Sequence, residues 1–170
     1  MNIATLAQTR ERLQALLLAV PGVGHVHLHE RYHSSEAAFR AQYLYTLPDA
    51  ALDAWGSQPH IRGWHIRRVA TSETTAAGRI LNEHSWQLRG YMALADEIGS
   101  ELIFDELIER MRAAVRYDQA LGLPGLLGQI EQQRGVQVAD AGPVRFCGAL
   151  CHSAVLQLST RTLAPSRPQR

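Results

Sequence analysis

Hydrophobic residues near the start of the chain recur at the spacing of a helix. The stripe comprises Ile3, Leu6, Leu13, Leu17 and Val20. Steps of three, four and seven residues place these side chains on one helical face, although Arg10 interrupts it. The stretch PGVG at 21–24 then supplies a proline and two glycines, which end helices. The pattern predicts an N-terminal helix over residues 2–20.

The following stretch, HVHLHERYH at 25–33, alternates histidine with aliphatic residues. A period of two predicts a β-strand in which Val26 and Leu28 face the core. His25, His27 and His29 then share the opposite face, which lines a solvent or subunit surface.

The next segment, SSEAAFRAQYLYTL, gives a mixed pattern. Ser34 or Ser35 could cap a short helix, whereas the residues YLY at 43–45 would also fit a strand. The sequence leaves both alternatives open. Residues 48–59 contain Trp55 and two prolines, and they predict a loop that could include one helical turn.

Two clear strands come after this loop, GWHIRRVAT and NEHSWQLRGYMAL. One face of the first carries Trp64, Ile66 and Arg68, and one face of the second carries His84, Trp86, Leu88 and Met92. Such alternation is typical of a sheet with one covered side. The polar segment TSETTAAGR at 71–79 is expected to be a long hairpin connection that is mobile or bound to something else.

The strongest helical pattern is SELIFDELIERMRAAVRY. Ser100 is a plausible N-cap, and acids near the start with arginines near the end suit the helix dipole. Six acids cluster around this segment and are interpreted as a solvated helix face. Its apolar stripe comprises Phe104, Leu107, Ile108, Met111 and Val115, and the acids are Asp96, Glu97, Glu101, Asp105, Glu106 and Glu109.

The C-terminal part contains an apolar loop or short helix at 121–128 and two predicted strands, VQVAD and VRFCGALCHSAVLQLSTRT. In the long strand, Phe146, Leu150, Leu156 and Leu158 are expected to share a face. Residues 163–170 are polar and proline-bearing, and they predict an extended tail.

Helices and antiparallel strands are mixed along the chain without the βαβ repeat of a parallel sheet. This order predicts an α+β fold: a single, mostly antiparallel sheet of four to five strands with helices packed on one face. The 170 residues, 46% of them hydrophobic, suit one domain over residues 1–162 followed by the tail.

Charge and cysteine content exclude some classes of protein. The net charge of +1 gives no global attraction to nucleic acid, and no segment has the length of apolar sequence that a membrane span needs. All 17 basic residues are arginine.

Cys147 and Cys151 would lie about 13 Å apart on one strand, too far to pair. They are expected to be buried free thiols in a reducing compartment, and the N-terminus is not expected to be a signal peptide.

Candidate chemistry is weak along the whole chain. Cys151 and His152 are neighbours on a strand and face opposite ways, so they cannot act as a nucleophile and its base. No phosphate-binding loop of standard spacing occurs. The alternative function is a small metal-dependent enzyme that uses His25, His27 and His29 with a further ligand such as Glu30 or His84. We expect no catalytic, metal or cofactor-binding residue.

Arginines and aromatic residues suggest an interface instead. The stretch IRGWHIRR mixes both types, which protein–protein interfaces enrich and which a nucleic-acid surface would also use. With an almost neutral chain, we favour a protein interface. The candidate contacts with other subunits or partners are Trp64, Arg67, Arg68, Tyr91, Arg167 and Arg170.

Several phrases also carry a family resemblance. They are GWHIRR with Trp64 and Ile66, then Gly90-Tyr91, Asp96 and Ser100-Glu101 before and in the helix, then Cys151-His152-Ser153-Ala154. With the order of elements over 23–158, this pattern resembles the small tail-terminator and tail-completion proteins of long-tailed bacteriophages.

The resemblance implies an α+β subunit of a hexameric ring, without catalysis or cofactor. Such a ring caps the finished tail tube, ends its polymerisation and joins it to the head-side connector or neck proteins, while genome DNA passes without specific binding. The implied location is the virion, after assembly in the host cytoplasm and without a membrane partner. The histidine strand would then face another layer, another subunit or the lumen.

Overall fold

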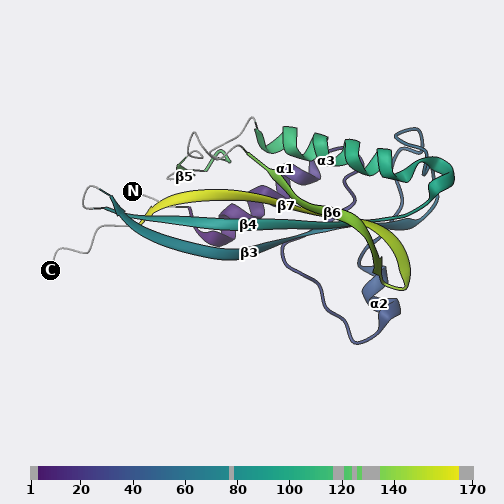
Figure 1. Ribbon diagram of the computed structural model, residues 1–170, viewed down its shortest axis with the longest axis horizontal. Coiled ribbons are helices and arrows are strands. Elements are labelled where there is room, and N and C mark those ends of the chain that lie inside the picture. The colour runs from purple at the N-terminus through teal and green to yellow at the C-terminus, as the bar shows by residue number, and fades with distance from the viewer. Residues whose placement is uncertain (1–3, 77–78, 117–120, 124–125, 128–134, 165–170) are drawn as a thin grey trace.

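A seven-stranded, mostly antiparallel sheet forms the centre of the protein. The computed structural model describes residues 4–76, 79–116, 121–123, 126–127 and 135–164. Two longer helices lie along one side of the sheet, and a short helix projects from the opposite side (Figure 1). The helices are α1 (Leu6–Leu18), α2 (Glu36–Ala41) and α3 (Ser100–Arg116), with the 3-10 turn η1 (Asp96–Ile98) before α3. The strands are β1 (His25–His27), β2 (Leu44–Tyr45), β3 (His60–Ala76), β4 (Arg79–Ala93), β5 (Leu126–Leu127), β6 (Gln137–Phe146) and β7 (Ala149–Ala164).

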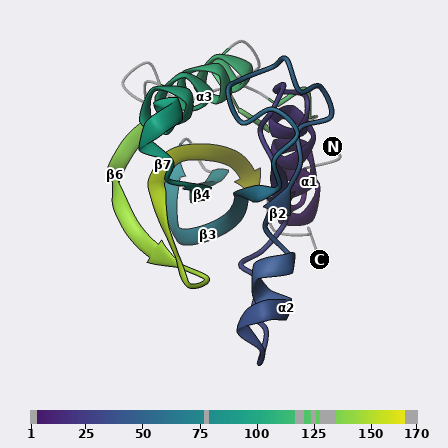
Figure 2. The same cartoon turned by 90° about the vertical axis from the view of Figure 1, so that its right-hand side faces the viewer.

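Three long strands carry the sheet. β3 pairs antiparallel with β4, and β4 pairs antiparallel with β7 from Ile80 to Ala93. The remaining strands are added at the two sides: β1 runs parallel to β3, β2 runs antiparallel to it, and β5 and β6 pair with separate parts of β7. Seen along the strands, the sheet is strongly curved, with α3 and α1 beside it (Figure 2). The curvature reflects the right-handed twist of strands.

The main core lies between the two longer helices and one face of β3, β4 and β7. Trp64 is completely buried and stacks on Phe104 of α3 with ring centroids 5.7 Å apart. Trp64 is paired in register with Gly90 of β4. A Cβ atom at Gly90 would overlap the indole ring of Trp64, so the absence of a side chain there makes room for the tryptophan.

A second, smaller core lies on the opposite face of the sheet. Tyr91 stacks on Phe146 with ring centroids 3.7 Å apart, and Tyr43 contacts both rings edge-on. Phe39 of α2 and Cys151 of β7 also belong to this cluster. The cluster explains why α2 lies on this side, because Phe39 is the residue through which the short helix packs.

The predicted α+β class is confirmed, with α1 and α3 on one face of a mostly antiparallel sheet. The sheet has more strands than the four to five expected, because three very short strands join the four long ones in the described residues. These short strands have only two or three residues, which is too few for an alternation pattern to be recognised.

The N-terminal helix is confirmed within narrower bounds than 2–20. Thr5 caps it, since its hydroxyl accepts from the N–H of Gln8 while the Gln8 side chain accepts from the N–H of Thr5. Leu13, Leu17 and Val20 are buried as predicted, whereas Leu6 is partly exposed. Ile3 lies outside the described residues.

The segment 34–47 satisfies both alternatives in turn. Ser35 caps α2 by accepting from the N–H of Ala38, and the residues that fitted a strand form β2 on the edge of β3. Residues 48–59 form turns and bends without a helix, as the loop prediction required. Trp55 of this loop stacks on His60 with ring centroids 4.0 Å apart.

The predicted polar connection at 71–79 is wrong. β3 continues through Ala76 and β4 begins at Arg79, and the two strands stay in register over this stretch. Thr71, Thr74 and Thr75 favour extended backbone. Because this end of β3 is exposed, it forms a strand without the apolar residues by which the other strands were recognised.

The expected long final strand is also wrong, because it is two strands. β6 ends at Phe146. A turn at Cys147 and Gly148, whose φ angles are positive at 49° and 73°, then leads into β7. Leu156 and Leu158 are buried in the main core, but Leu150 is half exposed and Phe146 packs on the opposite face. The tail begins later than predicted, since β7 reaches Ala164.

The long helix is confirmed as α3, including all five members of its apolar stripe. Ser100 does not act as its N-cap. Its hydroxyl instead accepts from the N–H of Ala95 and lies 2.8 Å from Nε2 of His152. The serine therefore joins the start of α3 to β7 rather than to its own first turn.

Candidate functional site

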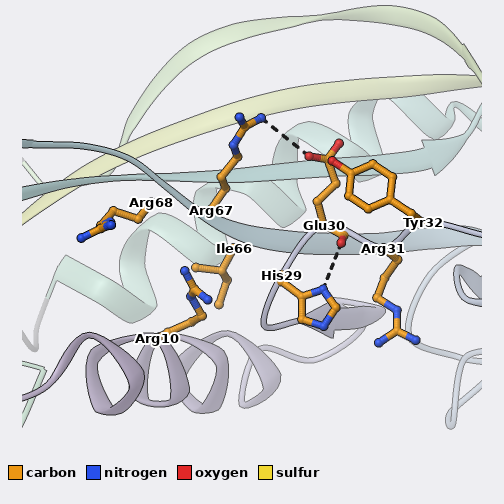
Figure 3. Close-up of a pocket in the computed structure, with 8 residues that line it drawn as sticks. All are labelled: Arg10, His29, Glu30, Arg31, Tyr32, Ile66, Arg67 and Arg68. Carbon is orange, nitrogen blue, oxygen red and sulfur yellow. Dashed lines mark hydrogen bonds and ion pairs between the residues drawn. The ribbon is translucent and has the colours of Figure 1, made fainter.

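An open groove of roughly 570 Å³ lies beside β3, where the sheet edge, the start of α1 and residues 29–32 meet. Four arginines from these three segments line it, together with a single carboxylate, Glu30 (Figure 3). We call it the arginine groove, and its lining comprises Arg10, His29, Glu30, Arg31, Tyr32, Ile66, Arg67 and Arg68. With four arginines against one carboxylate, the groove is strongly basic, although the net charge of the whole chain is only +1.

The arginines of the groove are positioned by different contacts. Arg67 lies 3.6 Å from Glu30, and both side chains are partly exposed. Arg68 donates to the hydroxyl of Thr71, and the guanidinium of Arg10 lies 5.7 Å from the ring of Trp86. These contacts are weak, and Arg67 and Arg68 remain exposed along the groove.

The groove runs along an unpaired edge of β3. β1 covers this edge as far as His65, and then the chain bends away at Leu28. Beyond His65, no strand of the described residues pairs with this side of β3, although β3 continues to Ala76. Arg67 and Arg68 point to opposite faces of the strand at this point, so the free edge is flanked by positive charge on both sides. Charged residues at such an edge protect it from unspecific pairing and select what can cover it.

Two of the six predicted interface residues, Arg67 and Arg68, thus line an exposed groove. The prediction for Trp64 is wrong, because its side chain is fully buried in the main core. Tyr91 is only 7% exposed and is stacked on Phe146 beneath Arg89, so it too is a packing residue of this chain. Arg167 and Arg170 lie outside the described residues.

The histidine strand is shorter than predicted, and the side chains of its histidines bind backbone groups of the same chain. Val26 is buried as expected, while Leu28 is half buried in a bend. Nε2 of His25 donates to the carbonyl of Leu44, and Nε2 of His27 donates to the carbonyl of Gln42, both at 2.9 Å. The two rings therefore fasten the α2–β2 segment of the same chain to β1.

The further ligands considered for a metal site are elsewhere. His29 turns to the carbonyl of Glu30, Glu30 itself pairs with Arg67, and Nδ1 of His84 lies 2.9 Å from the Thr71 hydroxyl. Among the described residues, no group of three or more histidine, cysteine or acidic side chains has the geometry of a metal site.

His65 is a further buried histidine on β3. It lies on β3 beneath the smaller core, 3% exposed, and its Nδ1 has no hydrogen-bond partner within the described structure. Desolvation lowers the pKa of His65 to about 4, against the opposing effect of nearby Glu30. His65 is therefore neutral at physiological pH and behaves as a core residue.

The candidate nucleophiles are also buried. Cys147 and Cys151 are buried free thiols within the smaller core, as predicted, but Cys147 lies in the turn before β7 and not on one strand with Cys151. Burial raises the pKa of Cys147, and it raises the pKa of Cys151 to about 11. Both groups are thus protonated thiols at neutral pH, which are weak nucleophiles.

The contact between Ser100 and His152 joins a serine to a histidine, as in some hydrolases, but its surroundings differ from those of a catalytic pair. Ser100 is 1% exposed, and its oxygen accepts from the N–H of Ala95. His152 stacks on Phe104, and burial lowers the pKa of His152. A substrate has no access to the hydroxyl in this arrangement, so the pair holds the η1–α3 junction against β7.

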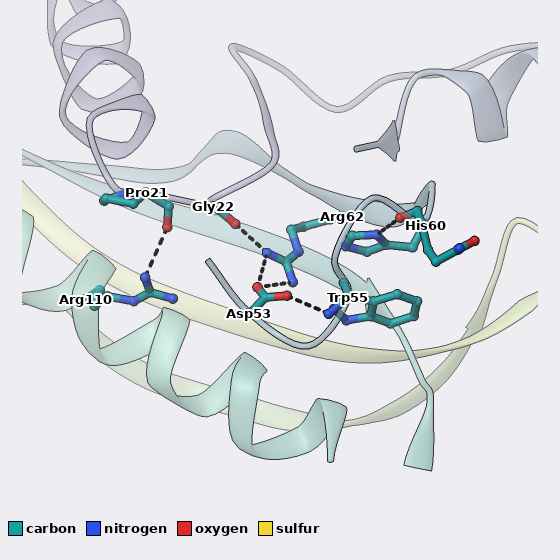
Figure 4. A network of polar contacts seen from close by, with 8 residues as sticks. Pro21, Gly22, Asp53, Trp55, His60, Arg62 and Arg110 are labelled. Carbon is teal, nitrogen blue, oxygen red and sulfur yellow. Dashed lines mark hydrogen bonds and ion pairs between the residues drawn. The ribbon is translucent and has the colours of Figure 1, made fainter. Parts of the chain in front are cut away.

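A second polar network lies around Arg62, which is completely buried on β3 (Figure 4). Arg62 of β3 donates to both the carbonyl of Gly22 and the carboxylate of Asp53, each at 2.9 Å. Asp53 also accepts from the N–H of Trp55, and Arg110 of α3 donates to the carbonyl of Pro21. This network fastens two loops to the sheet, which is a structural role.

No protein-family model matches the chain, and no curated protein sequence matches it either. In the part of the chain that the structure describes, none of the helices combines the length and apolar character needed to span a membrane.

Proposed function

We propose that this protein is a structural subunit of a bacteriophage tail, of the tail-terminator type. It forms a ring that caps the tail tube, ends tube polymerisation and offers a surface to the head-side connector. The proposed partners are further copies of the chain, the tube protein and the connector or neck proteins, and genome DNA passes through the ring without specific binding. The proposed location is the virion, after assembly in the host cytoplasm.

The arginine groove at the free edge of β3 is the observation that carries this proposal. An exposed edge with unpaired backbone groups is a surface that a partner covers. Arginine is enriched in the centres of protein interfaces because its planar group forms several directed hydrogen bonds at once. Arg67 and Arg68 combine both features at one place.

The chemistry of the buried groups favours assembly over catalysis. The two thiols and the Ser100 hydroxyl are enclosed in packed regions, and His25 and His27 are engaged with backbone carbonyls of their own chain. An enzyme would expose such side chains to its substrate, whereas here they pack inside the protein or bind its own backbone.

Native mass spectrometry of the gently desalted protein is the first test. A closed, metal-free hexamer is the expected result, and negative-stain images of the same sample should show a ring with a central opening. A monomer or dimer that carries one divalent ion per chain would contradict the proposal and favour the histidine-based metal enzyme.

The capping activity needs a second experiment. Tube protein of the same phage is polymerised with and without an equimolar amount of this protein, and tube lengths are measured by electron microscopy. The expected outcome is shorter tubes with a disc at one end. An unchanged length distribution, together with tube ends free of the protein, would contradict the terminator function even if the ring forms.

A further inference from the structure

A second charged surface lies on the outer face of α3. Glu101, Asp105 and Glu109 follow one another at four-residue steps, so they share one side of the helix. Glu106 lies next to them, and all four acids are exposed. In the middle of this acidic face is Leu102, which is 74% exposed. The opposite side of α3 is buried in the main core, so this face points away from the sheet.

The acidic face and the arginine groove are complementary in two respects. The face carries four carboxylates around an exposed leucine, and one of them, Glu109, already pairs with Arg112. The groove carries four arginines, of which Arg67 pairs with Glu30, and the ring of Tyr32, which is 79% exposed. An apolar contact surrounded by ion pairs is the arrangement of a small protein interface. Arginine and carboxylate groups also fit each other in geometry, since the guanidinium can donate two parallel hydrogen bonds.

We propose that the acidic face of α3 in one copy of this chain docks into the arginine groove of a second copy. Leu102 packs on Tyr32, and Glu101 and Asp105 pair with Arg67 and Arg68. The docked helix covers the free edge of β3. The inference rests on the self-association that the proposed function requires, and it names the two surfaces through which that association occurs.

The two surfaces are different, so the contact is heterologous. Each copy offers both a groove and a helix face, so a docked pair still has one free groove and one free helix face. Repetition of such a contact produces a ring when the rotation closes, or a filament when it does not. A contact between identical patches would stop at a dimer.

Other anionic partners fit the groove less well. The groove is open, so it would cover little of a small anion such as phosphate. The chain carries a net charge of only +1, which gives a nucleic acid little long-range attraction. The acidic face of the same chain supplies the complementary charge at equal concentration.

Charge reversal on either side provides the test. The groove variant carries Arg67→Glu and Arg68→Glu, and the helix variant carries Glu101→Arg and Asp105→Arg. A control variant with Arg40→Glu and Arg145→Glu reverses the same number of exposed charges on α2 and β6. All are examined by sedimentation velocity at low and high ionic strength, with circular dichroism to verify folding.

Wild type and control are expected to self-associate at low ionic strength, and each charge variant alone should associate at least about tenfold more weakly. An equimolar mixture of the two charge variants should regain the assembly, because each acidic surface then meets a basic one. Recovery in the mixture cannot arise from misfolded chains. It therefore separates docking from a loss of stability.

Several outcomes would overturn the inference. One is a wild-type chain that stays monomeric at low salt, and another is a set of variants that assemble as the wild type does. Failure of the mixture to recover would also overturn it. Binding to a short DNA duplex and to inorganic phosphate is measured as well. If the wild type binds either of them and only the groove variant loses that binding, the groove serves another partner and the inference is wrong. If rings persist in both charge variants, the proposed function stands and only the docking surfaces are wrong. If charge-dependent assembly ends in open filaments that do not cap tubes, the docking surfaces stand and the terminator function is wrong.

Discussion

The carboxylate of Asp53 lies 2.9 Å from the guanidinium of Arg62, and both side chains are almost completely buried. The pair joins the 48–59 loop to β3. Desolvation lowers the pKa of Arg62, while its hydrogen bond to Asp53 acts in the opposite direction. The arginine remains charged, and the carboxylate of Asp53 offsets the free-energy cost of removing the guanidinium from water.

Removal of this carboxylate should therefore destabilise the protein. We expect Asp53→Ala to lower the free energy of unfolding by about 3 kcal/mol, because it leaves a buried guanidinium without its counter-charge. Urea unfolding followed by tryptophan fluorescence measures the change. Asp140→Ala on the exposed strand β6 is the control and should change stability by less than about 0.5 kcal/mol. Equal effects of the two substitutions would contradict a stabilising role for the pair.

Gly90 provides a test of the core packing. Gly90→Ala should lower the free energy of unfolding by about 2 kcal/mol, because the added methyl group overlaps the ring of Trp64 and neither strand can move independently. Gly142→Ala on β6 is the matched control, since nothing lies within 4 Å of a Cβ atom there. Thermal unfolding of the two variants compares them directly. A Gly90 variant as stable as the Gly142 variant would mean that the indole has room to shift.

Stability should also depend on pH through His65. The pKa of His65 is about 4 in the folded protein and about 6.5 in an unfolded chain. Between these values the unfolded chain binds a proton that the folded one does not, so stability falls as the pH is lowered from 6.5 and this loss ends near pH 4. The total should be a few kcal/mol.

His65→Gln removes this titration while keeping a polar side chain of similar size. The free energy of unfolding of the variant, measured in urea between pH 7.5 and about 4.5, should fall less steeply than that of the wild type. The carboxylates are common to both proteins and cancel in the comparison. Parallel curves would show that another group carries the pH dependence.

The thiols should be unreactive in the folded state. Iodoacetamide at neutral pH is expected to modify Cys151 very slowly, because burial raises the pKa of Cys151 to about 11 and excludes the reagent. Cys147 should react slowly for the same reason, and both should react at once in denaturant. Mass spectrometry after timed quenching counts the modified groups. Rapid labelling of Cys151 in the native protein would mean that the smaller core opens readily.

Much of the fold was predictable from alternation and helical spacing. Ile66, Trp86 and Leu88 alternate with polar residues, and each is buried where the pattern placed it. The stripe of α3 was equally clear, because a half-buried helix needs apolar residues at three- and four-residue steps.

The failures occurred where burial does not determine the conformation. Residues 71–75 lie in a strand and are exposed on both of its faces, so they have no apolar positions to recognise. The turn between β6 and β7 was missed because Cys147 adopts a positive φ angle that non-glycine residues rarely adopt. Only Gly148 offered a signal there.

The candidate site was half predictable. Arg67 and Arg68 were found because they lie together on one strand, but Arg10 and Arg31 reach the same groove from other segments. No local pattern reports such a convergence. Trp64 was wrongly assigned to the surface because a tryptophan is as typical of a core as of an interface, and the neighbouring arginines do not distinguish the two cases.

The long ladder between β4 and β7 has a mechanical consequence. The two strands stay in register from Ile80 with Ala164 to Ala93 with Cys151, without a bulge. Antiparallel hydrogen bonds lie across the strand direction, so a pull along the strands loads all of them together instead of one after another. The sheet is therefore stiffest along its long axis, and a force in that direction would separate or unfold the helices and short strands before it separates β4 from β7.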